Sequence, residues 1–353
     1  STEQMRAEFA PADNAKYQNL LFGVQGTGGS TAIANSFEQY RKAGATARAM
    51  LVAAAAEAWG VAASEISVKA GTLSHPSGKS ATFGEMAAAA AALDVPGDVT
   101  LKTPDQWVYI GKGFPRLDVA NKTVGAPNTY GMDVQRDDQL VAVLTRPRAF
   151  GATVASLNAD EARKVAGVVD VIDVPGHGVA VLATSTWPAI KAQGLLEIEW
   201  DESTAETRSS DALFDEYRKL AQAEGPVFRH DGDAAAQLEG AANVVEETFE
   251  FPYLAHGMME PMVLTIHVEG DRATLWHPSQ FQTSDQATAA AVLGIPQENV
   301  TVNTLYAGGS FGRRASPDAR HVVEAATIAK IWGKSQPIKL VYTREDDTRA
   351  GYY

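Results

Sequence analysis

A glycine-rich loop at residues 307–314 has residue types that could bind an anionic group. Its sequence, Ala-Gly-Gly-Ser-Phe-Gly-Arg-Arg, follows an apolar run at residues 300–306 that is typical of a strand. Glycine lets a backbone approach a ligand closely and take positive φ. Exposed N–H groups beside Arg313 and Arg314 would suit a phosphate or pyrophosphate. A glycine-rich turn followed by a solvated basic helix start is the alternative, and the local sequence leaves both open.

A second glycine-rich turn, Gln-Gly-Thr-Gly-Gly-Ser-Thr at residues 25–31, precedes a helix predicted over residues 36–59. Alanine and methionine recur in this helix at steps of three or four residues, which indicates close packing on one face. A glycine turn at a helix N-terminus is an arrangement that binds anions. An ordinary loop with a helix start signal has the same appearance, because isolated glycine motifs produce many false positives.

Gln280 is a third candidate, at the end of a hairpin predicted from strands at residues 263–268 and 273–276. A neutral amide beside a glycine-rich loop can hydrogen-bond an oxo ligand or a carbonyl without adding charge. A surface amide that ends a hairpin is the alternative. The 307–314 loop lacks the Gly-Lys-Ser/Thr ending of a P-loop, which disfavours nucleotide triphosphate hydrolysis.

Other acidic and histidine residues carry weaker signals. His256 and Glu260 are four residues apart, but no second histidine stands at metal-ligand spacing. We therefore expect backbone groups in a buried loop to satisfy both, in preference to zinc. The acidic residues Glu345, Asp346 and Asp347 are expected to form a solvated turn.

The composition excludes several classes of protein and site. A net charge of -13 argues against a nucleic-acid binder, because the phosphate backbone demands a basic face. The absence of cysteine rules out disulfides, thiolate zinc sites, a cysteine nucleophile and any cysteine-held iron–sulfur cluster on this chain. No apolar run reaches the ~18–20 residues of a membrane-spanning helix. A chain of 353 residues, 45% of them hydrophobic, can form several domains with a sizeable core.

Strand and helix patterns alternate between residues 140 and 200, which predicts a compact α/β module of about 90 residues. Turn residues and Pro104 place one boundary near residues 95–105, and a polar stretch after residue 200 is expected to connect to the next region. Further strands are expected at residues 5–9, 66–70, 140–145, 168–174, 179–184, 195–200, 244–251 and 338–342. Further helices are expected at residues 83–92, 159–165, 187–193, 284–293 and 318–331.

Taken together and in order, these motifs resemble the molybdenum-binding subunits of the xanthine dehydrogenase/aldehyde oxidase family. The isoquinoline 1-oxidoreductase beta-subunit type and related membrane-bound aldehyde dehydrogenases are the most similar branch. Residues 27–31 resemble a molybdopterin-contacting turn, and residues 113–200 resemble the α/β hammerhead domain, with Arg-Leu-Asp at 116–118 and Tyr-Gly-Met-Asp at 130–133. Residues 256–261, 278–280 and 308–314 resemble parts of the first molybdopterin-binding domain.

The resemblance implies an α+β (mixed α/β) fold in three regions. Residues 1–104 would be the N-terminal part of the molybdopterin-binding region, residues 105–203 the hammerhead domain, and residues 204–353 an incomplete first molybdopterin-binding domain. The implied reaction is hydroxylation of an aldehyde or N-heteroaromatic with water as oxygen donor. In it a metal-bound hydroxide attacks carbon while hydride passes to a sulfido ligand.

The resemblance also implies roles for individual residues. Gln280 would hydrogen-bond the apical oxo group of molybdenum, Phe311 would lie beside the substrate, and no residue of this chain would ligate the metal directly. Ser310 stands where the family commonly has a third glycine. The molybdopterin, expected in its cytosine dinucleotide form, would contact Thr27, Gly28, Gly29, Ser30, Thr31, Gln280, Gly309, Ser310, Phe311, Gly312 and Arg313.

Partners follow from the same resemblance. Iron–sulfur clusters need cysteines, so they are expected on a 2Fe–2S partner subunit; the remainder of the molybdenum subunit and a cytochrome c subunit are further candidates. The branch favours a periplasmic or membrane-associated complex, with a cytoplasmic one as the alternative. No motif here matches the family's catalytic glutamate, so we expect an interior portion of such a subunit that is inactive alone. A cofactor-free scaffold protein and a plain anion-binding α/β protein are the alternative functions.

Overall fold

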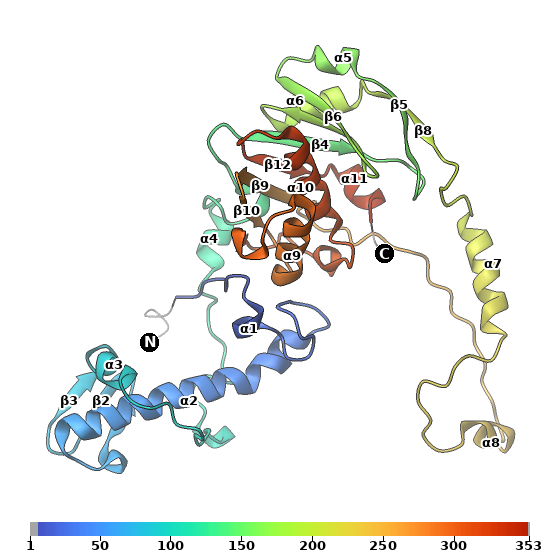
Figure 1. Cartoon of the computed structure of the whole chain (residues 1–353). Helices are drawn as coiled ribbons and strands as arrows, with labels where there is room; N and C mark the ends of the chain where they lie inside the picture. Colours follow the sequence, from blue (N-terminus) through green and yellow to red (C-terminus); the bar gives the residue numbers. More distant parts are fainter. Residues whose placement is uncertain (1–5, 352–353) are drawn as a thin grey trace.

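A seven-stranded mixed sheet forms the centre of the computed structural model, which describes residues 6–351 (Figure 1). The strands lie in the order β11-β10-β9-β12-β4-β7-β6. Their bounds are β4 (Leu140–Thr145), β6 (Val168–Val174), β7 (Gly178–Ala183), β9 (Val263–Glu269), β10 (Arg272–His277), β11 (Val300–Thr304) and β12 (Ile338–Val341).

The sheet joins parts of the chain that the sequence analysis placed in separate regions. Strand β12 pairs in parallel with β4, with Ile338 opposite Leu140, and in antiparallel with β9. The hairpin β9–β10 forms as expected, with Glu269 opposite Arg272, and β11 adds in parallel to β10. The sheet therefore continues across the boundary expected at residues 203 and 204, and the 140–200 segment is not a self-contained module. The domain boundaries remain a prediction.

Helices cover both faces of this sheet because the central strands are apolar on both sides. Leu140, Ala142 and Leu144 of β4 belong to a core shared with α9 (Gln282–Leu293) and α10 (Arg320–Trp332). Val143, on the opposite face, belongs to a second core with α6 (Thr186–Gln193) and α5 (Asp160–Arg163). This alternation follows from the two-residue period of a strand. A two-stranded sheet of β5 (Thr153–Asn158) and β8 (Glu197–Asp201) completes this end.

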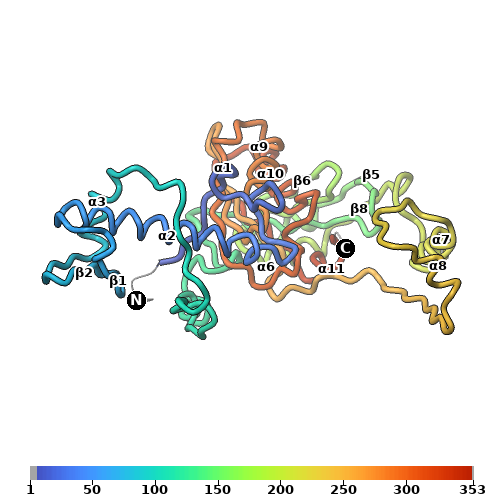
Figure 2. Tube along the Cα trace, turned by 90° about the horizontal axis from the view of Figure 1, so that it is seen from below, coloured from blue at the N-terminus to red at the C-terminus, as the bar shows by residue number. Residues whose placement is uncertain are grey.

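The N-terminal part contains a long helix with a small sheet at its far end (Figures 1 and 2). A core of Ala55, Ile66 and Leu73 holds this end together. Its elements are α1 (Asn14–Tyr17), α2 (Thr31–Trp59), η2 (Ala63–Glu65), β1 (Ser67–Lys69), β2 (Thr72–Ser74), β3 (Ser80–Thr82) and α3 (Phe83–Ala91). The connection to the central sheet contains η3 (Pro104–Gln106), α4 (Val119–Thr123) and η4 (Gly131–Asp133).

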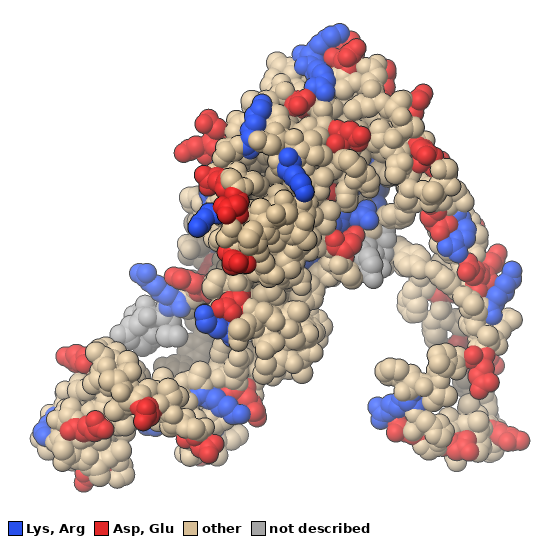
Figure 3. Space-filling view, in the orientation of Figure 1, with Lys and Arg blue, Asp and Glu red and all other residues tan. Residues whose placement is uncertain are grey.

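An exposed arm leaves the central sheet after β8 and returns before β9 (Figures 1 and 2). It contains α7 (Ser210–Ala221) and α8 (Ala234–Glu239). The strand expected at residues 244–251 does not form, because this segment pairs with no described strand. Figure 3 shows acidic and basic side chains interspersed over the face in view.

The remaining sequence predictions differ mainly at the ends of elements. Helix α2 begins five residues earlier than expected, and β11 ends at Thr304. Residue 5 of the strand expected at 5–9 lies outside the described residues, and residues 6–9 form no strand. Strand β5 and helix α11 (Arg344–Arg349) were not predicted. No helix in the described part of the chain has the length and apolar character to cross a membrane.

Candidate functional site

The side chain of Gln280 connects the two glycine-rich turns. Its Nε2 atom donates a hydrogen bond of 2.8 Å to the carbonyl oxygen of Thr27, and the Thr27 N–H donates to the Gln280 carbonyl oxygen at 2.8 Å. Its Oε1 atom accepts from Ser310 Oγ at 2.5 Å and from the Arg314 N–H at 3.2 Å. The fold thus brings together three segments that the sequence analysis singled out independently. Their predicted roles toward a cofactor remain predictions.

The loop after β11 presents bare backbone to solvent. Gly309, Phe311 and Gly312 take φ values of 89°, 54° and 98°. Left-handed backbone is strained for a residue with a Cβ, which explains glycine at two of these positions. Within residues 6–351, the N–H groups from Gly309 to Gly312 have no hydrogen-bond acceptor. Phe311 is 72% exposed, so its ring covers none of the protein core.

The turn before α2 has a similar character. Gly29 and Ser30 both take a φ of 55°, and Ser30 caps the helix without a side-chain hydrogen bond. No described residue accepts from the N–H groups of Gly28, Gly29 or Ser30. These donors stand at the N-terminus of a helix of 29 residues, where the helix dipole favours negative charge.

The two turns fit an anionic, oxygen-rich group such as a molybdopterin phosphate. A Cβ built on Gly28 or Gly29 would have no neighbour nearer than 3.7 Å, so the space over this backbone is open. Over Gly312 the nearest atom is His256 Nε2 at 3.8 Å. Open space above unpartnered N–H donors is what close approach of such a group requires. The donors are neutral amides, so they bind oxygens without a cationic side chain.

Glu260 holds the loop in place from the side of the protein core. Its Oε2 atom accepts from the Gly308 N–H at 3.1 Å and from Arg314 Nη2 at 3.1 Å, and its Oε1 atom accepts from the Met132 N–H at 2.9 Å. A Cβ on Gly308 would lie 2.5 Å from the Glu260 Cβ, so glycine here is a matter of space. The carboxylate therefore links the loop to η4.

Comparison with known proteins agrees with this arrangement. Residues 219–352 match the family described as the molybdopterin cofactor-binding domain. Over 98% of its length the chain is 30% identical to the beta subunit of isoquinoline 1-oxidoreductase from Brevundimonas diminuta. The chain is homologous to the molybdenum-binding subunits of the xanthine dehydrogenase/aldehyde oxidase family. It covers 49% of that curated relative, so it spans about half of the length of the protein it matches.

Other homologues belong to the same group of oxidoreductases. The membrane-bound aldehyde dehydrogenase of Gluconacetobacter polyoxogenes is 28% identical over 92% of the chain, which covers 44% of that protein. Quinoline 2-oxidoreductase from Pseudomonas putida 86 has a similar fold, with a TM-score of 0.53 and 19% identity over 67% of this chain and 35% of that one. The Cu,Mo-CO dehydrogenase structure gives a TM-score of 0.52 at 18% identity, over 67% of this chain and 36% of that one. These comparisons confirm the mixed α/β fold and the family resemblance inferred from the sequence.

The two arginines that follow the loop are buried, so the interpretation of a solvated basic helix start is wrong. Arg313 is 3% exposed and Arg314 is 1% exposed. Arg313 Nη2 donates to the Ala350 carbonyl oxygen at 3.0 Å, whereas Arg314 is paired with Glu260. Their guanidinium groups thus contact protein groups and not the open side of the loop. A direct role of Arg313 at the cofactor stays a prediction.

Two further expectations about this region need correction. Glu260 is satisfied largely by backbone groups as expected, but the buried Nδ1 atom of His256 has no partner among the described residues. Burial, followed by the nearby Arg313, lowers the pKa of His256. Asp347 is not in a solvated turn: it is 4% exposed in α11, with its carboxylate 3.7 Å from Arg313 Nε. Asp346 caps the same helix by accepting from Thr343 Oγ1 at 2.9 Å.

The sequence analysis missed a buried polar cluster next to this site. His277, Asp285 and His321 lie together, and Ser279 Oγ donates to Asp285 Oδ2 at 2.5 Å. Burial lowers the pKa of His277 to about 3 and raises the pKa of Asp285 to about 7. The pKa of His321 is also lowered, first by burial and then by His277. Their separation in sequence carries no recognisable motif, so only the fold reveals the cluster.

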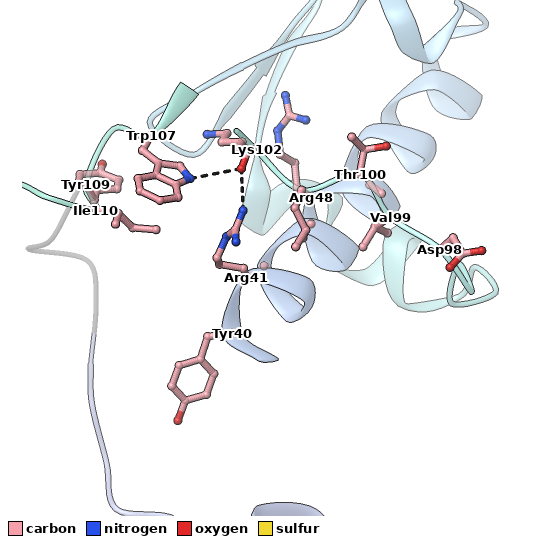
Figure 4. A pocket seen from close by; sticks show the side chains of 14 residues that line it. Tyr40, Arg41, Arg48, Asp98, Val99, Thr100, Lys102, Trp107, Tyr109 and Ile110 are labelled. Carbon is pink, nitrogen blue, oxygen red and sulfur yellow. Dashed lines mark hydrogen bonds between the residues drawn. The ribbon is translucent and has the colours of Figure 1, made fainter. Parts of the chain in front are cut away.

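Large cavities do not mark the Gln280 site. A cavity of about 610 Å³ lies between α2 and the connection that follows the N-terminal sheet (Figure 4). Arg41 Nη2 and Trp107 Nε1 both donate to the Lys102 carbonyl oxygen there, at 2.7 and 3.3 Å. A smaller cavity of about 270 Å³ includes Gly26 and Thr27 in its lining. The glycine turns therefore form an open surface site.

Proposed function

We propose that this chain forms the molybdopterin-binding part of a molybdenum hydroxylase that oxidises an aldehyde or an N-heteroaromatic compound. The observation that carries the proposal is the junction at Gln280, which joins two rows of unpartnered backbone N–H groups. The match of residues 219–352 to a molybdopterin cofactor-binding domain supports the same assignment. The molybdenum centre, when bound, supplies the oxygen transfer and the two-electron redox chemistry.

The residues of this chain bind and orient the cofactor in this proposal. The N–H groups of residues 309–312 and the turn at residues 27–31 donate to its oxygens, and Gln280 presents its amide at the junction between them. The ring of Phe311, 72% exposed, lies where it can contact the substrate. Because Gln280 Oε1 already accepts two hydrogen bonds, the remaining N–H of Nε2 is the group available to an oxo ligand.

The complete enzyme needs components beyond these residues in this proposal. The sequence contains no cysteine, so the iron–sulfur clusters belong to a 2Fe–2S partner subunit. Several relatives are named as subunits of larger enzymes. One of them is a nicotinate dehydrogenase subunit of Pseudomonas putida, which is 22% identical over 87% of this chain and 26% covered by it. A cytochrome c subunit, the remaining molybdenum-subunit residues and the cytosine dinucleotide form of the pterin are parts of the same proposal.

Metal and pterin analysis of the chain coexpressed with molybdopterin biosynthesis and its partner genes tests this function. We expect molybdenum and pterin to copurify with the complex, and Gln280→Ala to lower both. Gln237→Ala, on the exposed helix α8, is the matched control and should retain them. Absence of molybdenum from the unmodified complex would favour a cofactor-free scaffold. Binding of inorganic phosphate by that metal-free protein would favour a plain anion-binding protein.

A further inference from the structure

Three buried side chains from three elements converge beside Gln280. His277 ends β10, Asp285 lies in the first turn of α9, and His321 lies in the first turn of α10. They are 0%, 2% and 1% exposed. One possible ligand atom from each lies within 4.8 Å of the other two, and His277 Nε2 is 3.6 Å from Asp285 Oδ2.

The imidazoles of this cluster have no hydrogen-bond partner within the described residues. All four ring nitrogens, Nδ1 and Nε2 of His277 and of His321, are buried and unpaired. Buried polar groups in folded proteins are almost always paired, because an unpaired one keeps the full cost of leaving water. The four nitrogens therefore point to a partner that accepts electron pairs. A metal ion is such a partner.

We propose that His277, Asp285 and His321 bind a divalent transition-metal ion of the zinc class. Two imidazole nitrogens and one carboxylate oxygen are a donor set that suits Zn²⁺. Mg²⁺ and Ca²⁺ prefer oxygen ligands throughout, so nitrogen donors disfavour them. Zn–N and Zn–O distances of about 2.0–2.2 Å require the donor atoms to close by roughly 1 Å on binding. Ser279 Oγ, 2.5 Å from Asp285 Oδ2, is close enough to complete the coordination.

The electrostatic surroundings are compatible with a bound cation. Arg314 disfavours positive charge near His277, but its guanidinium is paired with Glu260 at 3.1 Å. Arg313, which acts on His321 in the same sense, is paired with Asp347. Because burial keeps both imidazoles neutral, their lone pairs are free for a metal at neutral pH. Asp285 would release its proton on binding and supply one negative charge.

A metal at this position would have a structural role. It would connect the end of β10 to the first turns of α9 and α10. Ser279, which is hydrogen-bonded to Asp285, directly precedes Gln280 in the chain. The ion would thereby hold Gln280 in position between the two glycine-rich turns. This proposal does not depend on the proposed function, because it concerns a second metal whose binding is measured without molybdenum.

The test measures metal in the full chain, purified without chelators and without a histidine tag. We expect about one zinc-class ion per chain by elemental analysis, in protein that contains no molybdenum. After chelator treatment, titration with Co²⁺ should produce visible d–d absorption with the intensity of a four-coordinate site. This measurement needs no variant, so it does not depend on whether a mutant folds.

Variants then assign the ligands. His321→Ala and His277→Gln should each lose the bound metal and the Co²⁺ absorption, with circular dichroism as the check of folding. His230→Ala, in the exposed arm, is the matched control and should keep both. The unmodified protein with neither bound metal nor a Co²⁺ spectrum would overturn the proposal, as would folded ligand variants that bind metal like the unmodified chain.

Discussion

Replacing Glu260 with glutamine should destabilise the protein strongly, because it removes one partner of a buried ion pair. The side chains of Arg314 and Glu260 are 0% and 7% exposed, and their atoms Nη2 and Oε2 are 3.1 Å apart. Arg314 Nε and Nη1 are already buried without partners among the described residues. After the substitution the guanidinium charge would remain buried with only carbonyl oxygens and a neutral amide nearby.

The magnitude follows from the burial of this pair. Removing one member of a buried ion pair costs about 3–5 kcal/mol, because the remaining charge is uncompensated. Burial lowers the pKa of Arg314 and the Glu260 carboxylate opposes that shift, which shows how far this charge depends on its partner. The new amide also has to meet the N–H groups of Gly308 and Met132, so one donor would face another. Such a loss is a large part of the ~5–15 kcal/mol that stabilises a typical protein.

Urea unfolding followed by tryptophan fluorescence measures this effect. The control is Glu161→Gln, which breaks a pair of 2.5 Å with Lys164 in which both side chains are 68% exposed. That control should cost less than about 1 kcal/mol. The double variant Glu260→Gln/Arg314→Leu removes both charges and should recover much of the loss. Equal effects of Glu260→Gln and Glu161→Gln would refute the argument that this pair is buried and mutually dependent.

Two other predictions concern packing and pH. Gly308→Ala should cost about 1–3 kcal/mol, because its Cβ would lie 2.5 Å from the Glu260 Cβ; Gly44→Ala, in the interior of α2 with no atom within 4 Å, should instead stabilise by about 0.5–1 kcal/mol in the same urea assay. In metal-free protein, unfolding should restore the lowered pKa values of His277 and His321 to about 6.5, so two protons bind on unfolding below that pH, whereas Asp285, raised to about 7, already holds one in the folded state. The net uptake of one proton should lower stability by about 1.4 kcal/mol per pH unit between about pH 6.5 and 4, measured as urea midpoints in chelator, and a flat profile would contradict the assignment.

Local patterns in the sequence were enough to predict much of the secondary structure. Strand β6 occupies the residues expected, and the hairpin β9–β10 turns at the Glu-Gly-Asp sequence that predicted it. Helix α2 ends at Trp59 because Gly60 takes the left-handed conformation, with φ at 65°. These features depend on neighbours within a few residues, such as apolar periodicity and glycine at a helix end. The sequence contains that information directly.

Features that depend on distant partners were predicted less well. The apolar alternation at residues 244–251 suits a strand, but a strand needs a neighbour for its backbone hydrogen bonds, and none lies beside this segment among residues 6–351. Strand β5 was missed, although it pairs with β8 and has an alternating pattern of exposure interrupted at a bulge. Asp347 was assigned to solvent because the arginines that pair with it are not evident from its own neighbours.

The sequence by itself determined that two glycine-rich turns and Gln280 were the places for chemistry, because glycine and amide side chains reveal themselves by type. Only the tertiary structure decided that Gln280 bonds to both turns, since 253 residues separate it from Thr27. It also decided that Arg313 and Arg314 are buried with carboxylates, while neutral N–H groups face outward. Burial and pairing are set by the whole fold, because a charge is stable inside a protein only where a distant segment brings its partner.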